Sequence, residues 1–244
     1  MAEPYLSIVI PAYNESLRIG KTLDAVRKYA ASKTFETEVV LVDDGSSDRT
    51  PELLREFQSV WPRARVLSNE VNRGKGYSVR RGVLESRGQL ILFTDADLSA
   101  PIEEADKLLA ALDASGADAA IGSRALDRKL IGVHQPWRRE FAGRCFNLFV
   151  RLFTGLPLND TQCGLKLFRR GSTRRAFELQ RVERFGFDPE VLFLIKRLGG
   201  KIVEVPVRWN NDPATKVHFL RDSMRMFLDL IVLRWRACSG QYSP

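Results

Sequence analysis

Two aspartates, Asp95 and Asp97, follow the apolar run 90–93 and a single threonine in this sequence of 244 residues. In extended backbone, side chains two residues apart point to the same side, so the two carboxylates are expected to converge on one point. Paired hard oxygen atoms suit Mg²⁺ or Mn²⁺, and Mg²⁺ commonly binds substrate phosphates as well. A solvated turn is the alternative interpretation, but the position at the end of a predicted strand favours a metal site.

Several basic residues have the chemistry to bind phosphate. The segment 72–76 (NRGKG) resembles a phosphate-binding loop, but it lacks the GxxxxGK[ST] spacing, and valine stands where the third glycine of GxGxxG would be. Its glycines are therefore expected to let the backbone approach a ligand or to cap the next helix, with Lys75 supplying positive charge. Arg124, Arg138 and Arg139 are further candidates, because a guanidinium group donates two parallel hydrogen bonds to phosphate.

The overall charge also points to an anionic partner. The chain has 38 Lys and Arg against 30 Asp and Glu, a formal charge of +8, which suits nucleic acid, phosphorylated small molecules or an acidic membrane surface. The basic residues are scattered among acidic ones and no nucleic-acid-binding motif is present, so no nucleic acid is expected as a partner.

The cysteines and the apolar runs indicate the compartment. The three cysteines form no CxxC pair, and with two histidines they have no zinc-ligand spacing, so a reduced, cytosolic chain is expected. The start of the chain has no charged-then-apolar leader, and no apolar run reaches the length of about 18 residues that a membrane span needs. A soluble or peripheral protein is the prediction.

The elements that must position these residues alternate along the first half of the chain. Predicted strands are 6–10, 38–42, 65–67, 89–94 and 117–121, and predicted helices are 17–32, 51–60, 76–86 and 102–114. This alternation predicts an α/β fold with a mostly parallel sheet and helices on both faces. Ligands of such sheets bind at the carboxyl ends of the strands, which selects the loops 11–15, 43–48 and 95–99.

The second half is less regular and contains no linker, so a single domain is predicted. Strands are expected at 160–168 and 201–209, around a helix at 188–198. A last helix, about 217–236, is apolar over most of its circumference and flanked by arginines. Such a helix is expected to lie in a membrane interface, although packing on the sheet is an equal alternative for part of its surface. The apolar stretch 145–153 has a similar character.

Five short motifs in order give the sequence a family resemblance. They are IPAYNE at 10–15, VDDGS at 42–46, NRGKG at 72–76, DAD at 95–97 and GSR at 122–124. Together they resemble the family 2 glycosyltransferases, which have the nucleotide-sugar-binding fold called GT-A. Among polyprenyl-phosphate enzymes, the segment 160–168 (DTQCGLKLF) is more similar to the dolichyl-phosphate β-glucosyltransferases than to the mannose synthases.

The resemblance implies roles for particular residues. It implies that Asp97, with Asp95, holds a divalent metal ion, Mg²⁺ or Mn²⁺. The nucleotide-sugar site would consist of Pro11, Tyr13, Glu15, Asp44, Lys75, Asp95 and Lys216. Arg124, Arg138 and Arg139 would bind the acceptor phosphate, and Asp95, Asp97 and Arg124 would be the catalytic residues. The single domain would then comprise a nucleotide-sugar half (1–124), an acceptor half (125–216) and an amphipathic, membrane-facing tail (217–244).

The expected reaction is a metal-dependent, inverting transfer of a hexose from a nucleotide sugar to a polyprenyl or dolichyl phosphate. Glucose from UDP-glucose is the expected donor, and a peripheral position at the cytosolic face of a membrane is the expected location. Transfer of mannose from GDP-mannose and transfer to a soluble or glycan hydroxyl are the alternatives. A non-catalytic protein or a basic nucleic-acid-binding protein is a more remote one.

Overall fold

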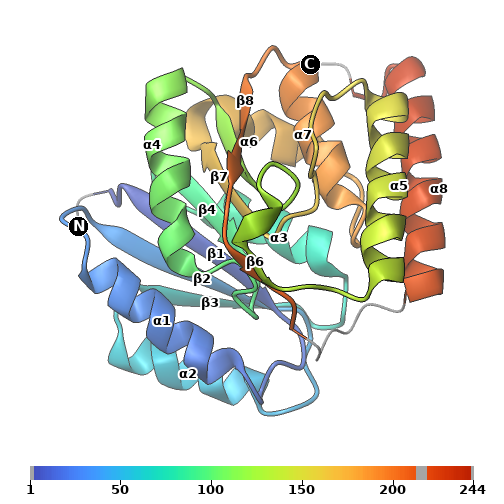
Figure 1. Cartoon of the computed structure of the whole chain (residues 1–244). Coiled ribbons are helices and arrows are strands. Elements are labelled where there is room, and N and C mark those ends of the chain that lie inside the picture. Colours follow the sequence, from blue (N-terminus) through green and yellow to red (C-terminus); the bar gives the residue numbers. More distant parts are fainter. Residues whose placement is uncertain (1–2, 213–218, 243–244) are drawn as a thin grey trace.

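The computed structural model describes residues 3–212 and 219–242, and its centre is a seven-stranded sheet in the order β3-β2-β1-β4-β7-β5-β8 (Figure 1). Its strands are β1 (Leu6–Ala12), β2 (Thr37–Asp43), β3 (Ala64–Ser68), β4 (Leu90–Thr94), β5 (Ala119–Ser123), β7 (Leu165–Arg169) and β8 (Ile202–Pro206). The sheet is mostly parallel, but β7 runs antiparallel to both β4 and β5. A second, two-stranded sheet pairs β6 (Ile131–Val133) with β9 (Trp209–Asn210).

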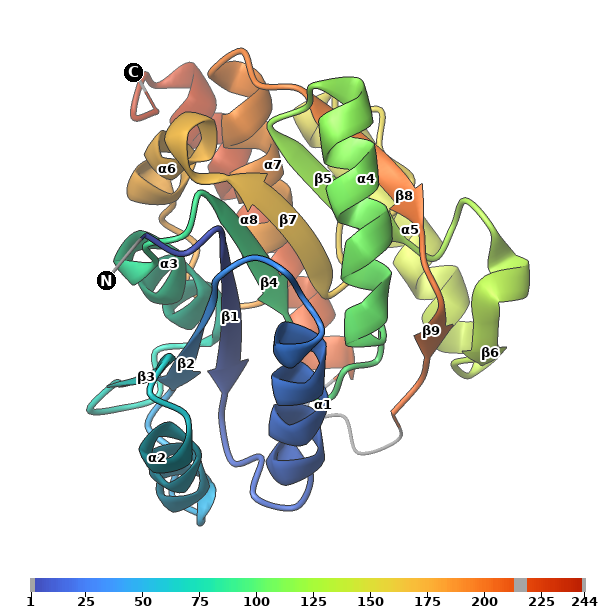
Figure 2. The same ribbon diagram turned by 90° about the vertical axis from the view of Figure 1, so that its left-hand side faces the viewer.

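Helices cover both faces of the large sheet (Figure 2). One face packs against α1 (Ile19–Ala31), α2 (Thr50–Val60) and α4 (Ala105–Ser115), and the other against α3 (Lys75–Glu85), α6 (Arg170–Leu179) and α7 (Phe187–Arg197). Short 3₁₀ helices occur at Ile102–Glu104 and Arg128–Leu130. The alternation along β1 produces the two cores, because Ile8 and Ile10 face the first set of helices and Val9 faces the second.

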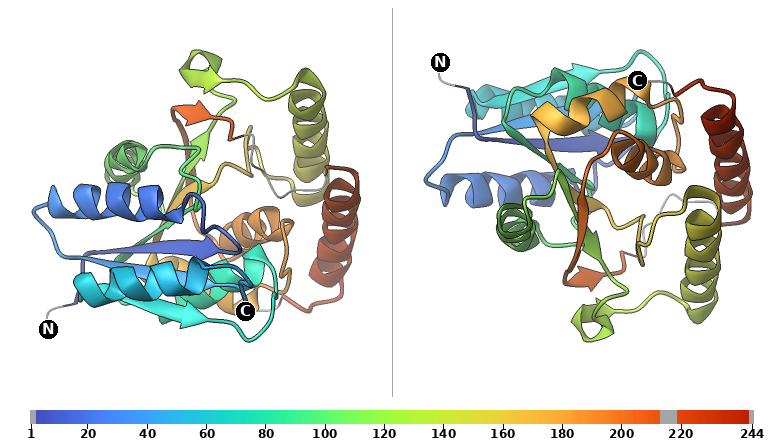
Figure 3. Two further views of the ribbon diagram at one scale, coloured as in Figure 1. Left: turned by 90° about the horizontal axis from the view of Figure 1, so that it is seen from below. Right: turned by 90° about the horizontal axis from the view of Figure 1, so that it is seen from above.

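Two long helices, α5 (Trp137–Thr154) and α8 (Phe219–Cys238), lie side by side at one edge of the molecule (Figure 3). Phe227 of α8 makes edge-to-face contacts with Phe149 and Phe153 of α5, at centroid distances of 5.2 and 6.1 Å. On α8, Leu233 is buried in the core while Trp235 is 61% exposed. One face of α8 therefore packs in the core, as one of the two interpretations expects, and the position of its exposed face in a membrane interface stays a prediction. Within residues 3–212 and 219–242, no helix is long and apolar enough to cross a membrane.

The predicted order of elements is confirmed in the first half, while the second half differs in three places. The strand expected at 160–168 begins only at Leu165, because the preceding residues form a loop beside β4. The segment 201–209 divides into β8 and β9, which belong to different sheets. Helices α5 and α6 were not predicted as elements, and of α5 only Val150 is fully buried, so the core gives its sequence little periodicity.

Candidate active site

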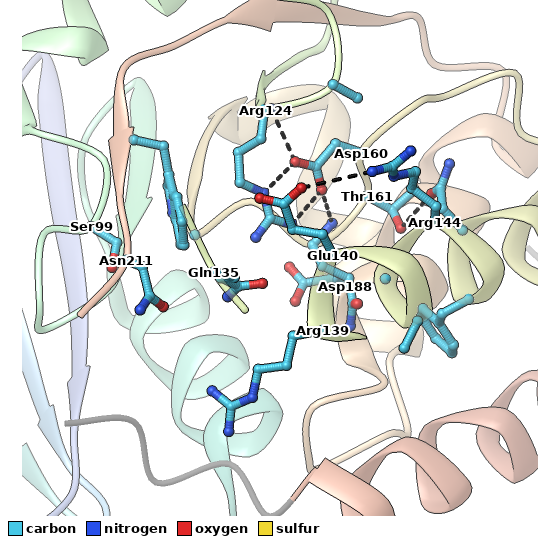
Figure 4. A pocket seen from close by; sticks show the side chains of 18 of the residues that line it. Ser99, Arg124, Gln135, Arg139, Glu140, Arg144, Asp160, Thr161, Asp188 and Asn211 are labelled. Carbon is cyan, nitrogen blue, oxygen red and sulfur yellow. Dashed lines mark hydrogen bonds and ion pairs between the residues drawn. The ribbon is translucent and has the colours of Figure 1, made fainter. Parts of the chain in front are cut away.

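The loops at the carboxyl ends of β4 and β5 open onto a cavity of about 530 Å³, which also reaches α5 and the segment 159–164 (Figure 4). Five of the residues predicted from the sequence border it: Lys75, Asp95, Asp97, Arg124 and Arg139. Of the three loops that the crevice rule for parallel sheets selected, 95–99 borders the cavity, while 11–15 and 43–48 do not.

The carboxylates of Asp95 and Asp97 both border this cavity, but not in the way the sequence suggested. The backbone there is a turn and is not extended: the Leu98 amide donates to the Asp95 carbonyl at 3.2 Å, and Leu98 has a φ of +47°. The Ser99 amide donates to Asp97 Oδ1 at 2.9 Å. The expectation of extended geometry is wrong, because a tight turn follows β4 at once and brings both side chains to the cavity.

Asp95 is held between Lys75 and Gly164. Lys75 Nζ lies 2.7 Å from Asp95 Oδ1, and the Asp95 amide donates to the Gly164 carbonyl at 3.1 Å. A Cβ atom on residue 164 would lie 2.5 Å from Asp95 Cγ, far inside the distance of about 3.5–4.0 Å at which carbon atoms pack. Only glycine therefore fits at this position while Asp95 keeps its place.

Arg18 is a site residue that the sequence analysis missed. Its guanidinium donates from Nη2 to Glu15 Oε1 at 2.9 Å and from Nη1 to Asp212 Oδ2 at 2.6 Å. The same Nη1 lies 3.9 Å from Asp97 Oδ2. A single arginine at the start of a predicted helix belongs to no motif, so the sequence cannot distinguish it from an ordinary surface charge. Its role becomes visible only in the fold.

Burial and neighbouring charges shift two pKa values in this cluster. Burial raises the pKa of Asp97, as does the negative charge of Asp95, and together they outweigh the Ser99 amide and the nearby cations. For Lys75, burial lowers the pKa, but the surrounding carboxylates, above all Asp95, outweigh it and leave the pKa raised. Lys75 is therefore a firmly charged ammonium group at neutral pH.

Arg124 borders the cavity but is engaged by Asp160. The Arg124 side chain donates from Nε and Nη2 to the two Asp160 oxygens at 2.6 and 2.8 Å, and its amide donates at 3.0 Å. Burial raises the pKa of the Asp160 carboxyl, but the charge and hydrogen bonds of Arg124 outweigh it and hold that pKa below its ordinary value. The guanidinium also lies 5.3 Å from the centroid of the Trp209 ring. Arg124 is thus fixed in place before any ligand arrives.

The two neighbouring arginines of α5 differ sharply. Arg138 is exposed, stacks on Trp137 and does not border the cavity. Arg139 borders it, and Figure 4 shows this side chain apart from the Arg124–Asp160 pair. Within residues 3–212 and 219–242, the Arg139 guanidinium has no hydrogen-bond or ion-pair partner, which leaves its donors for a ligand.

Glu140 contacts three other basic groups, of which Arg128 and Arg144 also border the cavity. Arg128 Nη2 lies 2.5 Å and Arg144 Nη2 3.7 Å from Glu140 Oε2, and His134 Nδ1 lies 2.7 Å from Oε1. The hydrogen bond from His134, helped by Arg128, holds the pKa of Glu140 below its usual value. This part of the wall keeps an excess of positive charge around one carboxylate.

Lys75 and Asp95 of the expected nucleotide-sugar site border the cavity, whereas its other described members lie at the ends of β1 and β2 and not on the cavity wall. Pro11 is buried in β1, Tyr13 is 39% exposed, and Glu15 is buried beside Arg18. Lys216 lies outside the described residues.

Asp44 is buried and acts inside the protein. It accepts hydrogen bonds from the side chains of Asn69 and Asn72 and from the amides of Arg73 and Gly74, at 2.7–3.0 Å. Its carboxylate thus fixes the loop that carries Lys75.

The loop 72–76 does not cradle phosphate with its backbone. Two of its amides are used by Asp44. Gly74 has a φ of +108°, and a Cβ there would lie 2.6 Å from the Glu183 carbonyl oxygen. A Cβ on Gly76 would lie 2.7 Å from Cβ of Phe187. These glycines therefore permit close packing against the start of α7, and they set the position of Lys75 rather than approach a ligand.

A buried ion pair that was not predicted from the sequence completes the floor of the cavity. Lys166 Nζ lies 2.6 Å from Asp188 Oδ1 and 2.5 Å from the Cys163 carbonyl oxygen. Lys166 is 2% exposed, while Asp188 borders the cavity. Phe93 lies beneath both Lys75 and Lys166, whose Nζ atoms are 5.3 and 5.7 Å from its ring centroid.

The carboxylates of Asp95 and Asp97 at the end of β4 suit a hard divalent cation, and they form a pair of ligands and not a larger group. In the part of the chain that the structure describes, no three His, Cys, Asp or Glu side chains form a metal-binding group. A two-carboxylate site is nevertheless typical of Mg²⁺, which usually keeps several waters and binds substrate phosphates in addition to one or two carboxylates. The residues present therefore fit such an ion only together with a phosphorylated ligand.

Sequence comparisons agree with this geometry. Residues 7–177 match the model of the family described as glycosyl transferase family 2. The chain is 36% identical over 239 residues to a dolichyl-phosphate β-glucosyltransferase of Trichomonas vaginalis, covering 94% of this chain and 73% of that protein. It is 34% identical to the dolichyl-phosphate β-glucosyltransferase of Saccharomyces cerevisiae, covering 98% of this chain and 77% of the yeast protein.

Solved structures give the same fold at much lower identity. The mannosyl-3-phosphoglycerate synthase of Rubrobacter xylanophilus superposes with a TM-score of 0.69 at 20% identity, covering 99% of this chain and 76% of that one. The glucosyl-3-phosphoglycerate synthase of Mycobacterium tuberculosis, crystallised with Mn²⁺, UDP-glucose and phosphoglyceric acid, gives 0.65 at 19%, with coverages of 97% and 80%. The fold is therefore GT-A, and the chain belongs to glycosyl transferase family 2 and is a glycosyltransferase.

Proposed function

We propose that this glycosyltransferase moves glucose from UDP-glucose to dolichyl phosphate or another polyprenyl phosphate, with inversion at the anomeric carbon. The observation that carries the proposal is a cavity bordered both by the carboxylate pair Asp95 and Asp97 and by Arg139, whose guanidinium has no hydrogen-bond or ion-pair partner within residues 3–212 and 219–242. The names of the relatives that are 31–36% identical to the chain support the choice of sugar and acceptor.

The donor end of the cavity is assigned to the carboxylate pair. Asp97 and Asp95 would hold Mg²⁺ or Mn²⁺, with the donor diphosphate supplying further oxygen ligands. A bound divalent ion would stabilise the negative charge that develops on the leaving nucleoside diphosphate. Lys75, which is firmly charged and fixed beside Asp95, would add a second positive charge at the same place. The nucleotide itself would lie along the ends of β1 and β2, next to Tyr13 and Glu15.

The acceptor end is assigned to Arg139, in preference to Arg138 and Arg124. Arg138 does not border the cavity and Arg124 is already bound to Asp160, whereas Arg139 borders the cavity and has no partner among the described residues. The second pKa of a phosphate monoester is about 6, so a lipid phosphate is largely a dianion at neutral pH and attacks without a general base. One phosphate oxygen forms the bond to the anomeric carbon, and the electrons of the broken bond leave with the diphosphate. A single displacement of this kind inverts the configuration.

The proposal includes a peripheral position on the cytosolic face of a membrane, through α5 and α8. Both helices carry exposed apolar side chains. On α5 these are Trp137, Phe141, Leu148, Phe149 and Leu152, and on α8 they are Met224, Leu228, Ile231, Val232 and Trp235. Exposed arginines, among them Arg144, Arg151 and Arg234, occur between these apolar residues along the two helices. Helices with an apolar face, tryptophan and flanking basic residues bind at the interface of anionic bilayers.

Transfer is tested directly with the whole chain. Purified protein is incubated with Mg²⁺, polyprenyl phosphate in vesicles and labelled UDP-glucose, with labelled GDP-mannose in a parallel reaction. We expect lipid-linked glucose, and we expect Asp97→Ala to abolish it while Asp24→Ala, on an exposed aspartate of α1, does not. Absence of lipid-linked product from both donors would refute the proposed function.

The acceptor assignment has its own measurement. Arg139→Ala is expected to raise the KM for polyprenyl phosphate by roughly 10- to 100-fold, as loss of a charge-assisted contact of about 1.5–3 kcal/mol implies, with the KM for the donor unchanged. Arg138→Ala, the neighbouring arginine, is the matched control and should leave both values close to those of the wild type. Equal effects of the two variants would contradict the assignment.

Membrane binding is tested by sedimentation with vesicles. Trp235→Ser combined with Leu152→Ser removes one exposed apolar side chain from each helix, and it should reduce binding to vesicles that contain anionic lipid. Val60→Ser, on the 68% exposed valine of α2, is the control. Unchanged binding of the double variant would remove α5 and α8 from the proposal.

A further inference from the structure

A buried tyrosine that follows α8 binds a buried carboxylate of α7. Tyr242 is 1% exposed, and its hydroxyl donates a hydrogen bond to Oε1 of Glu190, which is 0% exposed. Burial raises the pKa of Glu190, and the hydrogen bond from Tyr242 opposes that shift. A buried carboxylate is costly unless donors surround it, so Glu190 depends on the donors that it has.

The other oxygen of Glu190 holds the chain that leads into α7. Its Oε2 accepts hydrogen bonds from the amides of Arg181 and Val182, at 3.0 and 2.8 Å. These amides belong to the α6–α7 segment (residues 180–186), which joins the two helices. One carboxylate therefore binds the tyrosine with one oxygen and this segment with the other.

The α6–α7 segment supports the loop that carries Lys75. The Tyr77 amide donates to the Glu183 carbonyl at 3.0 Å. A Cβ on Gly76 would lie 2.6 Å from the Val182 carbonyl oxygen, so no space separates the two segments. Because they are in such close contact, a shift of the α6–α7 segment must be followed by the start of α3, where Lys75 lies.

We propose that Tyr242 is a positioning residue for Lys75, acting through Glu190 and the α6–α7 segment. The inference rests on the proposed function, in which Lys75 adds positive charge beside the leaving diphosphate. Lys75 Nζ lies 2.7 Å from Asp95 Oδ1, whereas Tyr242 does not border the cavity. The end of the chain that follows α8 thus acts on the transfer step from outside the cavity.

The structure offers a closely matched pair of variants. Tyr242→Phe removes one hydroxyl that binds a carboxylate. Tyr29→Phe does the same on α1, which packs on the other face of the sheet, since Tyr29 is 5% exposed and its hydroxyl donates to Asp106 Oδ1 at 2.8 Å. Both variants are expected to lower Tm, so a loss that follows from lower stability alone would appear in both.

The kinetic test compares these variants in transfer from UDP-glucose to polyprenyl phosphate. We expect kcat of Tyr242→Phe to fall about tenfold, less than the roughly 100-fold that a misplacement of about 1 Å causes. The KM for polyprenyl phosphate should stay unchanged, because the acceptor end lies on α5. Tyr29→Phe should keep the kcat of the wild type. In a Lys75→Met background, adding Tyr242→Phe should cause little further loss, because both changes act on the same group.

The second test needs no turnover. Amide hydrogen exchange is followed by mass spectrometry in the whole chain without substrates. We expect peptides from the α6–α7 segment and from 73–77 to exchange about 3- to 10-fold faster in Tyr242→Phe than in the wild type, as loss of one hydrogen bond implies. Tyr29→Phe should leave these peptides unchanged. Glu190→Gln, which removes the charge that both partners share, should act in the same direction as Tyr242→Phe.

Two results would overturn the inference. One is unchanged exchange of the α6–α7 segment in both Tyr242→Phe and Glu190→Gln. The other is a loss of kcat in Tyr242→Phe that Tyr29→Phe matches or that is additive with Lys75→Met. Failure of the proposed function is distinguishable from both, because it would appear as absent transfer in the wild type, and the exchange measurement does not depend on transfer.

Discussion

Replacing Gly164 by alanine places a methyl group where the carboxyl group of Asp95 now lies. The new Cβ atom would be 2.5 Å from Asp95 Cγ, and carbon atoms pack at about 3.5–4.0 Å. Asp95 or the 160–164 loop must therefore move by about 1 Å or more. The variant Gly164→Ala thus tests whether the position of Asp95 matters for the reaction, without changing any charge.

The expected loss can be estimated from that displacement. A misplacement of about 1 Å at a reacting centre can cost about 100-fold in rate, so we expect kcat of Gly164→Ala to fall by about that factor. Overpacking of this kind costs roughly 1–3 kcal/mol of stability, which leaves the protein folded at 25 °C. Gly20→Ala is the matched control, because no atom lies within 4 Å of its new Cβ.

A double-mutant cycle makes the reasoning specific to Asp95. In Asp95→Ala the collision partner is gone, so adding Gly164→Ala should cause little further loss, and the two effects on kcat should be strongly non-additive. Transfer to polyprenyl phosphate under saturating substrates is the assay, with thermal unfolding measured in parallel. A kcat of Gly164→Ala within threefold of the wild type, or additive effects in the cycle, would refute the role given to this contact.

Three further predictions concern stability and reactivity. The lowered pKa of Asp160 means that its pair with Arg124 stabilises the fold above the unfolded pKa of about 3.9. This contribution is lost as the pH falls through the folded pKa. Asp160→Asn should therefore cost about 3 kcal/mol near pH 7 and progressively less as the pH falls below the unfolded pKa in urea titrations, and a constant difference would contradict this. Lys166→Met leaves a buried carboxylate unpaired, so Tm should fall by about 10 °C, and an unchanged Tm would count against the pair. Burial raises the pKa of Cys163 to about 12, so mass spectrometry should find that Cys238 is alkylated at pH 8 while Cys163 is not; equal rates would show that Cys163 is accessible.

The sequence was sufficient for those parts of the fold that follow from short-range pattern. Strands β1 to β4 are short apolar runs bounded by turn residues, and the helices between them have an apolar face, so periodicity predicts both. The position of β7 between β4 and β5 is a property of the whole sheet. It depends on long-range pairing that no local pattern encodes, and the alternation of strands and helices favoured parallel neighbours instead.

The same division applies to the candidate site. Asp95 and Asp97 were predicted from their position after a strand end, and Arg139 was predicted from guanidinium chemistry and the family resemblance. Arg18 was not, because its importance comes from partners as far away as Asp212 along the chain. Asp44 had the right position for a ligand, but its hydrogen bonds are taken up by the neighbouring loop.

The antiparallel strand β7 also determines the order in which the chain can assemble during synthesis. Strands β3, β2, β1 and β4 all lie within residues 1–94 and pair with one another, so that half of the sheet can form early. Strand β5 is made next, yet both of its neighbours, β7 and β8, come later in the sequence. Until residue 169 has been synthesised, β4 keeps an open edge and β5 has no partner, and unpaired edges of this kind invite association between chains. A fragment that stops at residue 124 would keep the edge of β4 exposed permanently. The loops after β4 and β5 border the cavity, so its formation depends on the strands from the last third of the chain that pair with β4 and β5.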